Sequence, residues 1–167
     1  MSAPEHDHVR VQALVRVPPA EAFRLFTEDI DRWWRHGRAY RAGPTGGSVV
    51  HLEPRVGGAL YEAFETESGG HVERTGTVLA WEPPERLLLE WRHGNFAPAE
   101  RTEVEVRFAP SPSGTQVTLV HRGWSAIRPD HPVRHGDAPR AFLRSHGLWW
   151  GRLLRALQET ALQARER

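Results

Sequence analysis

The sequence predicts an α+β fold in which a curved antiparallel sheet of about six to seven strands wraps around a long C-terminal helix. In residues 76–91, two apolar runs flank a Pro83-Pro84 turn, a pattern typical of a hairpin. Further short runs with a period of two fill the middle of the chain. An amphipathic helical pattern precedes these runs, and a longer one follows them.

The first two elements are a strand and a helix. Apolar residues occupy alternate positions over residues 9–17, which predicts a strand with one buried face. Pro18-Pro19 ends it, and proline suits the first turn of a helix because its missing N–H would be unpaired there. One helix over residues 19–34 follows, and its apolar side is formed by Ala22, Phe23, Phe26, Ile30, Trp33 and Trp34.

The remaining pattern is a run of strands and a final helix. The predicted strands cover residues 49–52, 59–66, 72–81, 86–92, 102–108 and 116–122. Asp137 is the expected N-cap of the last helix, with Pro139 in its first turn and its end near Gln163. The whole chain is expected to form a single domain over residues 1–167, with a disordered tail at residues 1–7.

Composition excludes several classes of function. The chain has no cysteine, so it has no disulfide and no thiolate site for metal or catalysis. The net charge of +1 and the lack of a basic stripe argue against nucleic acid as a partner. No signal peptide and no apolar run of about 20 residues is present, so we expect a cytoplasmic protein without membrane association.

No motif indicates a cofactor, a metal or a nucleophile. The glycine-rich residues 43–47 lack the Gly-Lys-Ser/Thr ending of a phosphate loop. Among the ten histidines, His131 and His135 are four apart but lie in a proline- and glycine-rich loop, where no shared helix face is assured. No Gly-x-Ser-x-Gly sequence occurs. We therefore expect neither a cofactor nor a native metal site.

Four stretches together resemble the START-like (helix-grip, SRPBCC) superfamily, and within it the bacterial single-domain proteins related to the Hsp90 ATPase activator homologue 1 (AHSA1-like proteins). They are residues 18–34, from Pro-Pro-Ala-Glu-Ala-Phe to Trp-Trp; 53–58, Glu-Pro-Arg-Val-Gly-Gly; 76–87; and 115–124, from Thr-Gln-Val-Thr to Gly-Trp. The resemblance spans about residues 9–162. It implies a helix-grip fold with a cavity between the sheet and the last helix. The superfamily includes lipid and hormone binders and polyketide cyclases, so function must be argued from the site.

Strand periodicity assigns side chains to the wall of that implied cavity. If Val106 points inward, its neighbours Leu89, Trp91, Leu119 and His121 should do so as well. Trp33 or Trp34 and Trp149 or Trp150 could close the cavity. On residues 59–66, either Tyr61 or Glu62 faces inward, and the sequence leaves that register open. The candidate ligand-binding residues are Trp33, Trp34, Tyr61, Glu62, Leu89, Trp91, Val106, Leu119, His121, Trp149 and Trp150.

The sequence is compatible with three functions. The first is binding of a small apolar or aromatic molecule, since apolar walls with few polar groups are typical of such pockets. The second is a cyclase- or hydratase-like enzyme that uses His121, with Glu62 or Tyr61, as an acid or base. The third is a chaperone-accessory or other protein-interaction module, with Leu88 or Ile127 in an exposed apolar patch. A homodimer is also left open.

Overall fold

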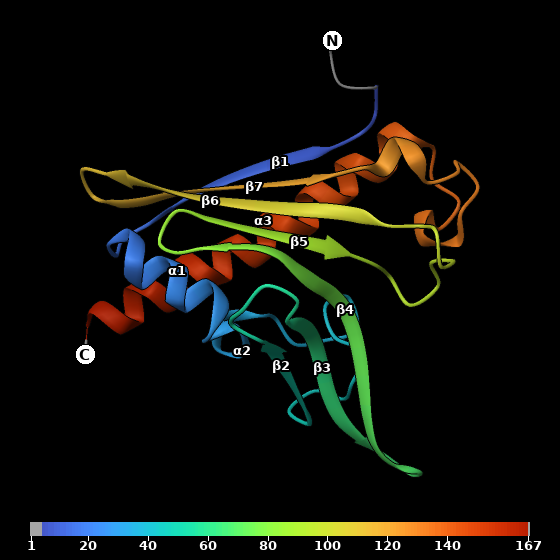
Figure 1. Cartoon of the computed structure of the whole chain (residues 1–167), viewed down its shortest axis with the longest axis horizontal. Coiled ribbons are helices and arrows are strands. Elements are labelled where there is room, and N and C mark those ends of the chain that lie inside the picture. The colour runs from blue at the N-terminus through green and yellow to red at the C-terminus, as the bar shows by residue number, and fades with distance from the viewer. Residues whose placement is uncertain (1–4, 167) are drawn as a thin grey trace.

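The computed structural model describes residues 5–166, and these form a curved seven-stranded antiparallel sheet with a long helix against one face (Figure 1). The strand order is β1-β7-β6-β5-β4-β3-β2. The strands are β1 (Val9–Val15), β2 (Ser48–Leu52), β3 (Ala59–Thr66), β4 (Gly69–Glu82), β5 (Arg86–Trp91), β6 (Thr102–Ser111) and β7 (Gly114–Arg122). The long helix is α3 (Pro139–Arg165). The predicted helix-grip architecture is confirmed.

The alternation along the central strands places one continuous apolar layer beneath α3. Leu87 of β5 lies opposite Val106 of β6, which lies opposite Leu119 of β7. All three side chains are fully buried, because a period of two sends every second residue of each strand to the same face. The register expected from the sequence for β5, β6 and β7 is therefore the observed one.

The predicted single helix over residues 19–34 is wrong in one respect, because it is broken into α1 (Pro19–Thr27) and α2 (Ile30–Trp33). The hydroxyl of Thr27 donates to the carbonyl of Phe23, and the chain turns before Ile30. The turn allows the consecutive residues Trp33 and Trp34 to be buried together. A continuous helix would point them about 100° apart.

Helix α3 covers the sheet from its β1 side and runs diagonally behind the strands in Figure 1. Its N-cap is Ala138 rather than the expected Asp137, and it ends at Arg165, two residues past Gln163. Pro139 occupies the first turn as predicted. The observed cap has no side-chain hydrogen bond, so the proline, whose fixed φ suits a first turn, marks this start better than the aspartate does.

The two ends of the chain differ from expectation only slightly. Residues 1–4 of the predicted tail lie outside the described residues. Asp7, assigned to the same tail, is held in place because its carboxylate accepts hydrogen bonds from the backbone N–H groups of Gly123 and Ser125 and from the Ser125 hydroxyl. Over residues 5–166, every helix is too short or too polar to cross a membrane.

The sheet extends beyond the helix at the β2–β4 end. Figure 1 shows the β3–β4 hairpin projecting away from α3, with the chain after α2 passing close to it. Because α3 does not reach this end, the concave face of β3 and β4 is covered instead by the loop of residues 34–47. A cleft forms where this loop replaces α3 over the sheet.

Candidate functional site

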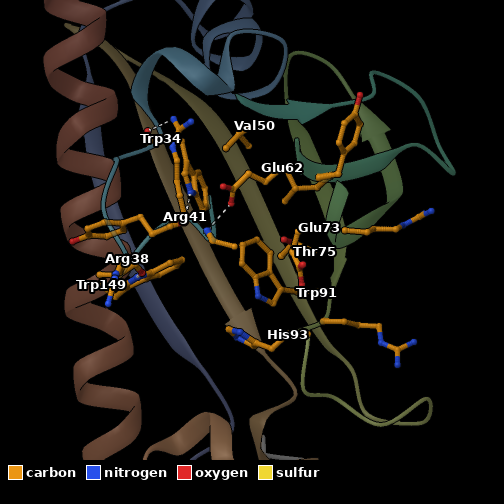
Figure 2. Close-up of a pocket in the computed structure, with 18 residues that line it drawn as sticks. Trp34, Arg38, Arg41, Val50, Glu62, Glu73, Thr75, Trp91, His93 and Trp149 are labelled. Atoms are coloured by element: carbon orange, nitrogen blue, oxygen red, sulfur yellow. Dashed lines mark hydrogen bonds between the residues drawn. The ribbon is translucent and has the colours of Figure 1, made fainter. Parts of the chain in front are cut away.

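A cleft of about 280 Å³ opens between the loop after α2 and the concave face of β3, β4 and β5. Figure 2 shows Trp34 and Glu62 at one end, Trp91 on the sheet side, Trp149 on the α3 side and His93 at the opposite end. Its buried apolar walls are Trp34, Val50, Leu60 and Trp91. Exposed Arg38 and Arg74 lie at the mouth, so the cleft is apolar in its depth and charged at its rim.

The indole rings of Trp34, Trp91 and Trp149 line the cleft. Trp34 meets Trp149 edge to face at 5.9 Å between ring centroids and tilts against Trp91 at 6.2 Å. The indole N–H of Trp34 donates to the carbonyl of Tyr40, and that of Trp149 donates to the carbonyl of Ala39. Both tryptophans are therefore fixed in position by the loop that they cover.

A buried arginine holds this loop against the sheet. The guanidinium of Arg41 is almost fully enclosed and donates to the Asp31 carboxylate at 2.8 Å, to the Trp34 carbonyl at 2.6 Å and to the Ser48 carbonyl at 2.9 Å. A planar guanidinium can satisfy several acceptors at once, which suits it to this task. The Arg41 charge is thus used for structure.

Glu62 resolves the register left open on β3. Its side chain points to the concave face, and its two carboxylate oxygens accept from the backbone N–H groups of Ala42 at 2.8 Å and Gly43 at 2.6 Å. Tyr61 points the other way and stacks on His51 at 4.9 Å, although it still borders the cleft. Both oxygens of Glu62 therefore have backbone partners, and neither partner of this carboxylate is His121.

His121 lies in a buried polar cluster under α3 and has every ring nitrogen paired. Its Nε2 is 2.7 Å from the hydroxyl of Thr102, and that hydroxyl is 3.1 Å from the Trp91 carbonyl. Its Nδ1 is 2.8 Å from Nε2 of His146 and 3.2 Å from the indole nitrogen of Trp150. The cluster links β5, β6, β7 and α3 at one point in the core.

One assignment of protons is compatible with all four contacts, with the single lone pair of His121 Nδ1 shared by two donors. The Trp150 indole can only donate and the Trp91 carbonyl can only accept. Nδ1 of His121 must therefore be the acceptor, its Nε2–H donates to Thr102, and the Thr102 hydroxyl donates to Trp91. His146 then donates its Nε2–H to His121. Both imidazoles are neutral, each with its proton on Nε2.

The electrostatics of the cluster agree with this assignment. Burial, followed by repulsion from His146 and His93, holds the pKa of His121 well below its ordinary value. Burial, followed by repulsion from His93, lowers the pKa of His146 to about 3. His121 is fully enclosed and borders neither the cleft nor the cavity beside it. This leaves the enzymatic hypothesis without an accessible acid or base at His121.

A second cavity of about 540 Å³ adjoins the cleft along α3. The two share the residues Ala39, His93, Gly94 and Trp149, and the second is otherwise lined by the loop after β5, the loop before α3 and the first turns of that helix. Burial, and then repulsion from His131 and His135, lowers the pKa of His93 to about 4. His93 is therefore a neutral imidazole at the boundary of both spaces.

The predicted site residues fall into two groups. Those that border the cleft are Trp34, Tyr61, Glu62, Trp91 and Trp149. Those that are buried in the core and border neither space are Trp33, Leu89, Val106, Leu119, His121 and Trp150. These side chains pack closely and fill the space between the sheet and α3, so no room is left there for a ligand. Trp33, for example, donates its indole N–H to the Leu25 carbonyl at 3.0 Å.

Three residues of this region were not predicted: His93, Thr102 and His146. His146 precedes Trp150 by four residues, so helical spacing could have placed it beside that tryptophan. Thr102 lies opposite Trp91 only through the pairing of β5 with β6, which no local pattern reveals. His93 follows the end of β5 and carries no signal of its own. Within residues 5–166, no three His, Asp or Glu side chains gather closely enough to hold a metal ion.

Comparison with known proteins identifies the family and the fold. Residues 16–161 match the family model described as activator of Hsp90 ATPase homolog 1-like protein. No curated protein matches the chain.

Three similar solved structures share the fold at low sequence identity. A crystal structure of a Nitrosomonas europaea protein is 16% identical, with 98% of this chain and 99% of that chain covered and a TM-score of 0.64. A Staphylococcus aureus protein of unknown function is 12% identical, with 96% of each chain covered and a TM-score of 0.67. The AHSA1-like protein of Aeromonas hydrophila is 18% identical, with 95% and 94% covered and a TM-score of 0.59. The family match spans most of the chain, and the chain belongs to the AHSA1-like family.

Proposed function

We propose that this protein binds a small, largely apolar aromatic molecule in the cleft between Trp34, Trp91 and Trp149. The observation that carries the proposal is the cleft itself, an opening of about 280 Å³ whose buried walls are indole rings and aliphatic side chains together with the paired Arg41 and Glu62. Small-molecule sites typically have apolar and aromatic walls with a small number of polar groups, and the cleft lies just below their usual volume of about 300–1,000 Å³. Aromatic faces and edges favour a flat aromatic ligand over a branched aliphatic one.

The charged groups around the cleft support binding rather than turnover. Glu62 is occupied by two backbone N–H groups, and Arg41 is occupied by carbonyls and Asp31. Glu73, on the sheet side, pairs with His71 at 2.9 Å. The buried charges thus stabilise the loop, and the ligand would make its main contacts with uncharged rings.

The interaction-module alternative receives less support from the residues first suggested for it. Ile127 is buried, with 2% of its surface exposed, and Leu88 is half-buried on β5. Neither contributes to an exposed apolar patch of the kind that a protein partner would cover. The aromatic cleft is therefore the stronger basis for a function.

Filling the cleft should abolish ligand binding. Thr75 is half-buried on the sheet side of the cleft, so Thr75→Phe is expected to occupy the space and to weaken binding of 2-naphthol at least 10-fold, as measured by tryptophan fluorescence. Val72→Phe is the matched control, because Val72 is 61% exposed and is not part of the cleft lining. Equal affinities of both variants and the unmodified protein would exclude the cleft as the site.

A further inference from the structure

The cleft and the adjoining cavity share four lining residues. Both spaces are bordered by Ala39 of the loop after α2, by Trp149 of α3, and by His93 and Gly94 of the loop after β5. Trp149 is joined to Ala39 by a hydrogen bond of 2.6 Å and stacks on Tyr40 at 5.8 Å. The cleft alone is slightly smaller than a usual small-molecule site, whose volume is about 300–1,000 Å³. A ligand of ordinary size would therefore extend past Trp149 into the cavity.

The cavity continues the aromatic surface along α3. Phe142, His146 and Trp149 are spaced by four and three residues, so they share one face of the helix. His146 stacks between the other two, at 5.4 Å from Phe142 and 5.5 Å from Trp149, with interplanar angles of 13° in both cases. With Tyr40 beyond Trp149, four rings form a nearly parallel row along both spaces. The row therefore lines both spaces with aromatic rings.

One atom in this row has a fixed hydrogen-bonding role. Nε2 of His146 carries the proton that is donated to His121, so Nδ1 of His146 has a free lone pair. Nδ1 has no hydrogen-bond partner within residues 5–166 and is not among the nitrogens that the protein encloses completely. Since His146 lines the cavity, this nitrogen is accessible from it. The low pKa of His146 keeps the lone pair unprotonated at neutral pH.

The tautomer of His146 is set by its contact with His121, which lies deeper in the core. Thr102 takes the Nε2–H of His121, and Trp150 donates to its Nδ1, so His121 can present only an acceptor to His146. His146 must then donate with Nε2 and accept with Nδ1. The buried cluster therefore determines that Nδ1 of His146, at the surface of the cavity, is a hydrogen-bond acceptor.

We propose that Nδ1 of His146 is a ligand-recognition atom that accepts a hydrogen bond from a hydroxyl or N–H group of the bound aromatic molecule. This inference rests on the proposed function and narrows the ligand class to aromatic compounds with a neutral donor at one end. The aromatic body lies between Trp91 and Trp149, and the donor end reaches the cavity beyond Trp149. Exposed polar residues at its rim, Asn95, Asp137 and Ser145, leave the outer side of that end solvated.

A pair of probes that differ in one donor tests the assignment. 2-Naphthol carries a hydroxyl, whereas in 2-methoxynaphthalene the hydroxyl hydrogen is replaced by a methyl group. The protein is expected to bind the naphthol roughly 3- to 10-fold more tightly, which is the effect of one hydrogen bond. In His146→Phe, which keeps a flat ring in the row but has no acceptor, this preference should vanish because the affinity for naphthol falls to that for the ether.

The controls separate this inference from the proposed function. Leu148→Ala alters an exposed position of the same helix that borders neither space and should keep the preference for naphthol. His146→Phe should remain folded, since His121 keeps the Trp150 indole as a donor to Nδ1. Equal binding of both probes by the unmodified protein, or a preference that persists in His146→Phe, would overturn the role of His146 and leave the cleft as a site. Failure of both probes to bind would overturn the proposed function, and this inference with it.

Discussion

Lowering the pH from 6.5 to about 4.5 is expected to reduce the free energy of unfolding steeply. Three imidazoles near the core, those of His93, His121 and His146, have pKa values held below the ordinary 6.5 chiefly by burial. The unfolded chain takes up these protons as the pH falls through 6.5, whereas the folded protein does not. Each histidine therefore costs up to about 1.4 kcal/mol of stability per pH unit in this window. Urea unfolding at several pH values measures the slope.

The histidines and the carboxylates both lose their contributions to stability as the pH falls, but over different pH ranges. A lowered histidine pKa gives stability that is fully present above 6.5 and is lost as the pH falls toward the folded-state values, about 4 for His93 and about 3 for His146. Glu53, Glu100 and Glu105, whose pKa values are lowered from 4.5, lose their contributions only below that value. His146→Phe should make the free energy of unfolding less dependent on pH above pH 4.5, because unfolding then takes up one proton fewer. A stability that stays constant between pH 6.5 and 4.5 would contradict the neutral cluster.

Replacing Trp150 with alanine is expected to destabilise the protein by about 3–5 kcal/mol, the usual cost of removing a large aromatic side chain from a core. Trp150 is 1% exposed and contacts the rings of Trp34, Trp91 and Trp149. Its loss would create a cavity beneath the cleft and remove the indole donor to His121. Chemical denaturation followed by circular dichroism measures the change.

Trp150→Phe separates packing from hydrogen bonding. It keeps most of the ring volume and loses the contact from the indole nitrogen to His121, so it should cost about 1–2 kcal/mol. His121 Nδ1 would still accept from His146. A cost below about 1 kcal/mol for Trp150→Ala would mean that this tryptophan does not anchor α3 to the sheet.

The fold could be predicted from the sequence because its signals are local and repetitive. The alternation around Leu87, Val106 and Leu119 specifies which face of each strand is buried, and antiparallel pairing then aligns the rows. The break between α1 and α2 was not predicted, because the apolar spacing of residues 19–34 also suits one continuous helix.

The site was predicted only in part, since its formation depends on contacts between distant segments. Periodicity placed Trp91 and His121 on the same face, and both are there. It could not show that His121 is sealed by Thr102 and His146, or that the space opens beside Trp91 instead. The cleft lies where α3 no longer covers the sheet and the loop held by Arg41 covers it instead. No periodic pattern in the sequence encodes this position.

The binding site can be tested most directly by the indole N–H signals of the seven tryptophans in a nitrogen–proton correlation spectrum. Titration with 2-naphthol should shift the signals of Trp34, Trp91 and Trp149, which border the cleft. The signals of Trp33 and Trp81, which do not border it, should change little. Single Trp→Phe variants assign each signal. Saturable shifts confined to the three cleft tryptophans would confirm the site, and the absence of shifts, or shifts elsewhere only, would contradict it.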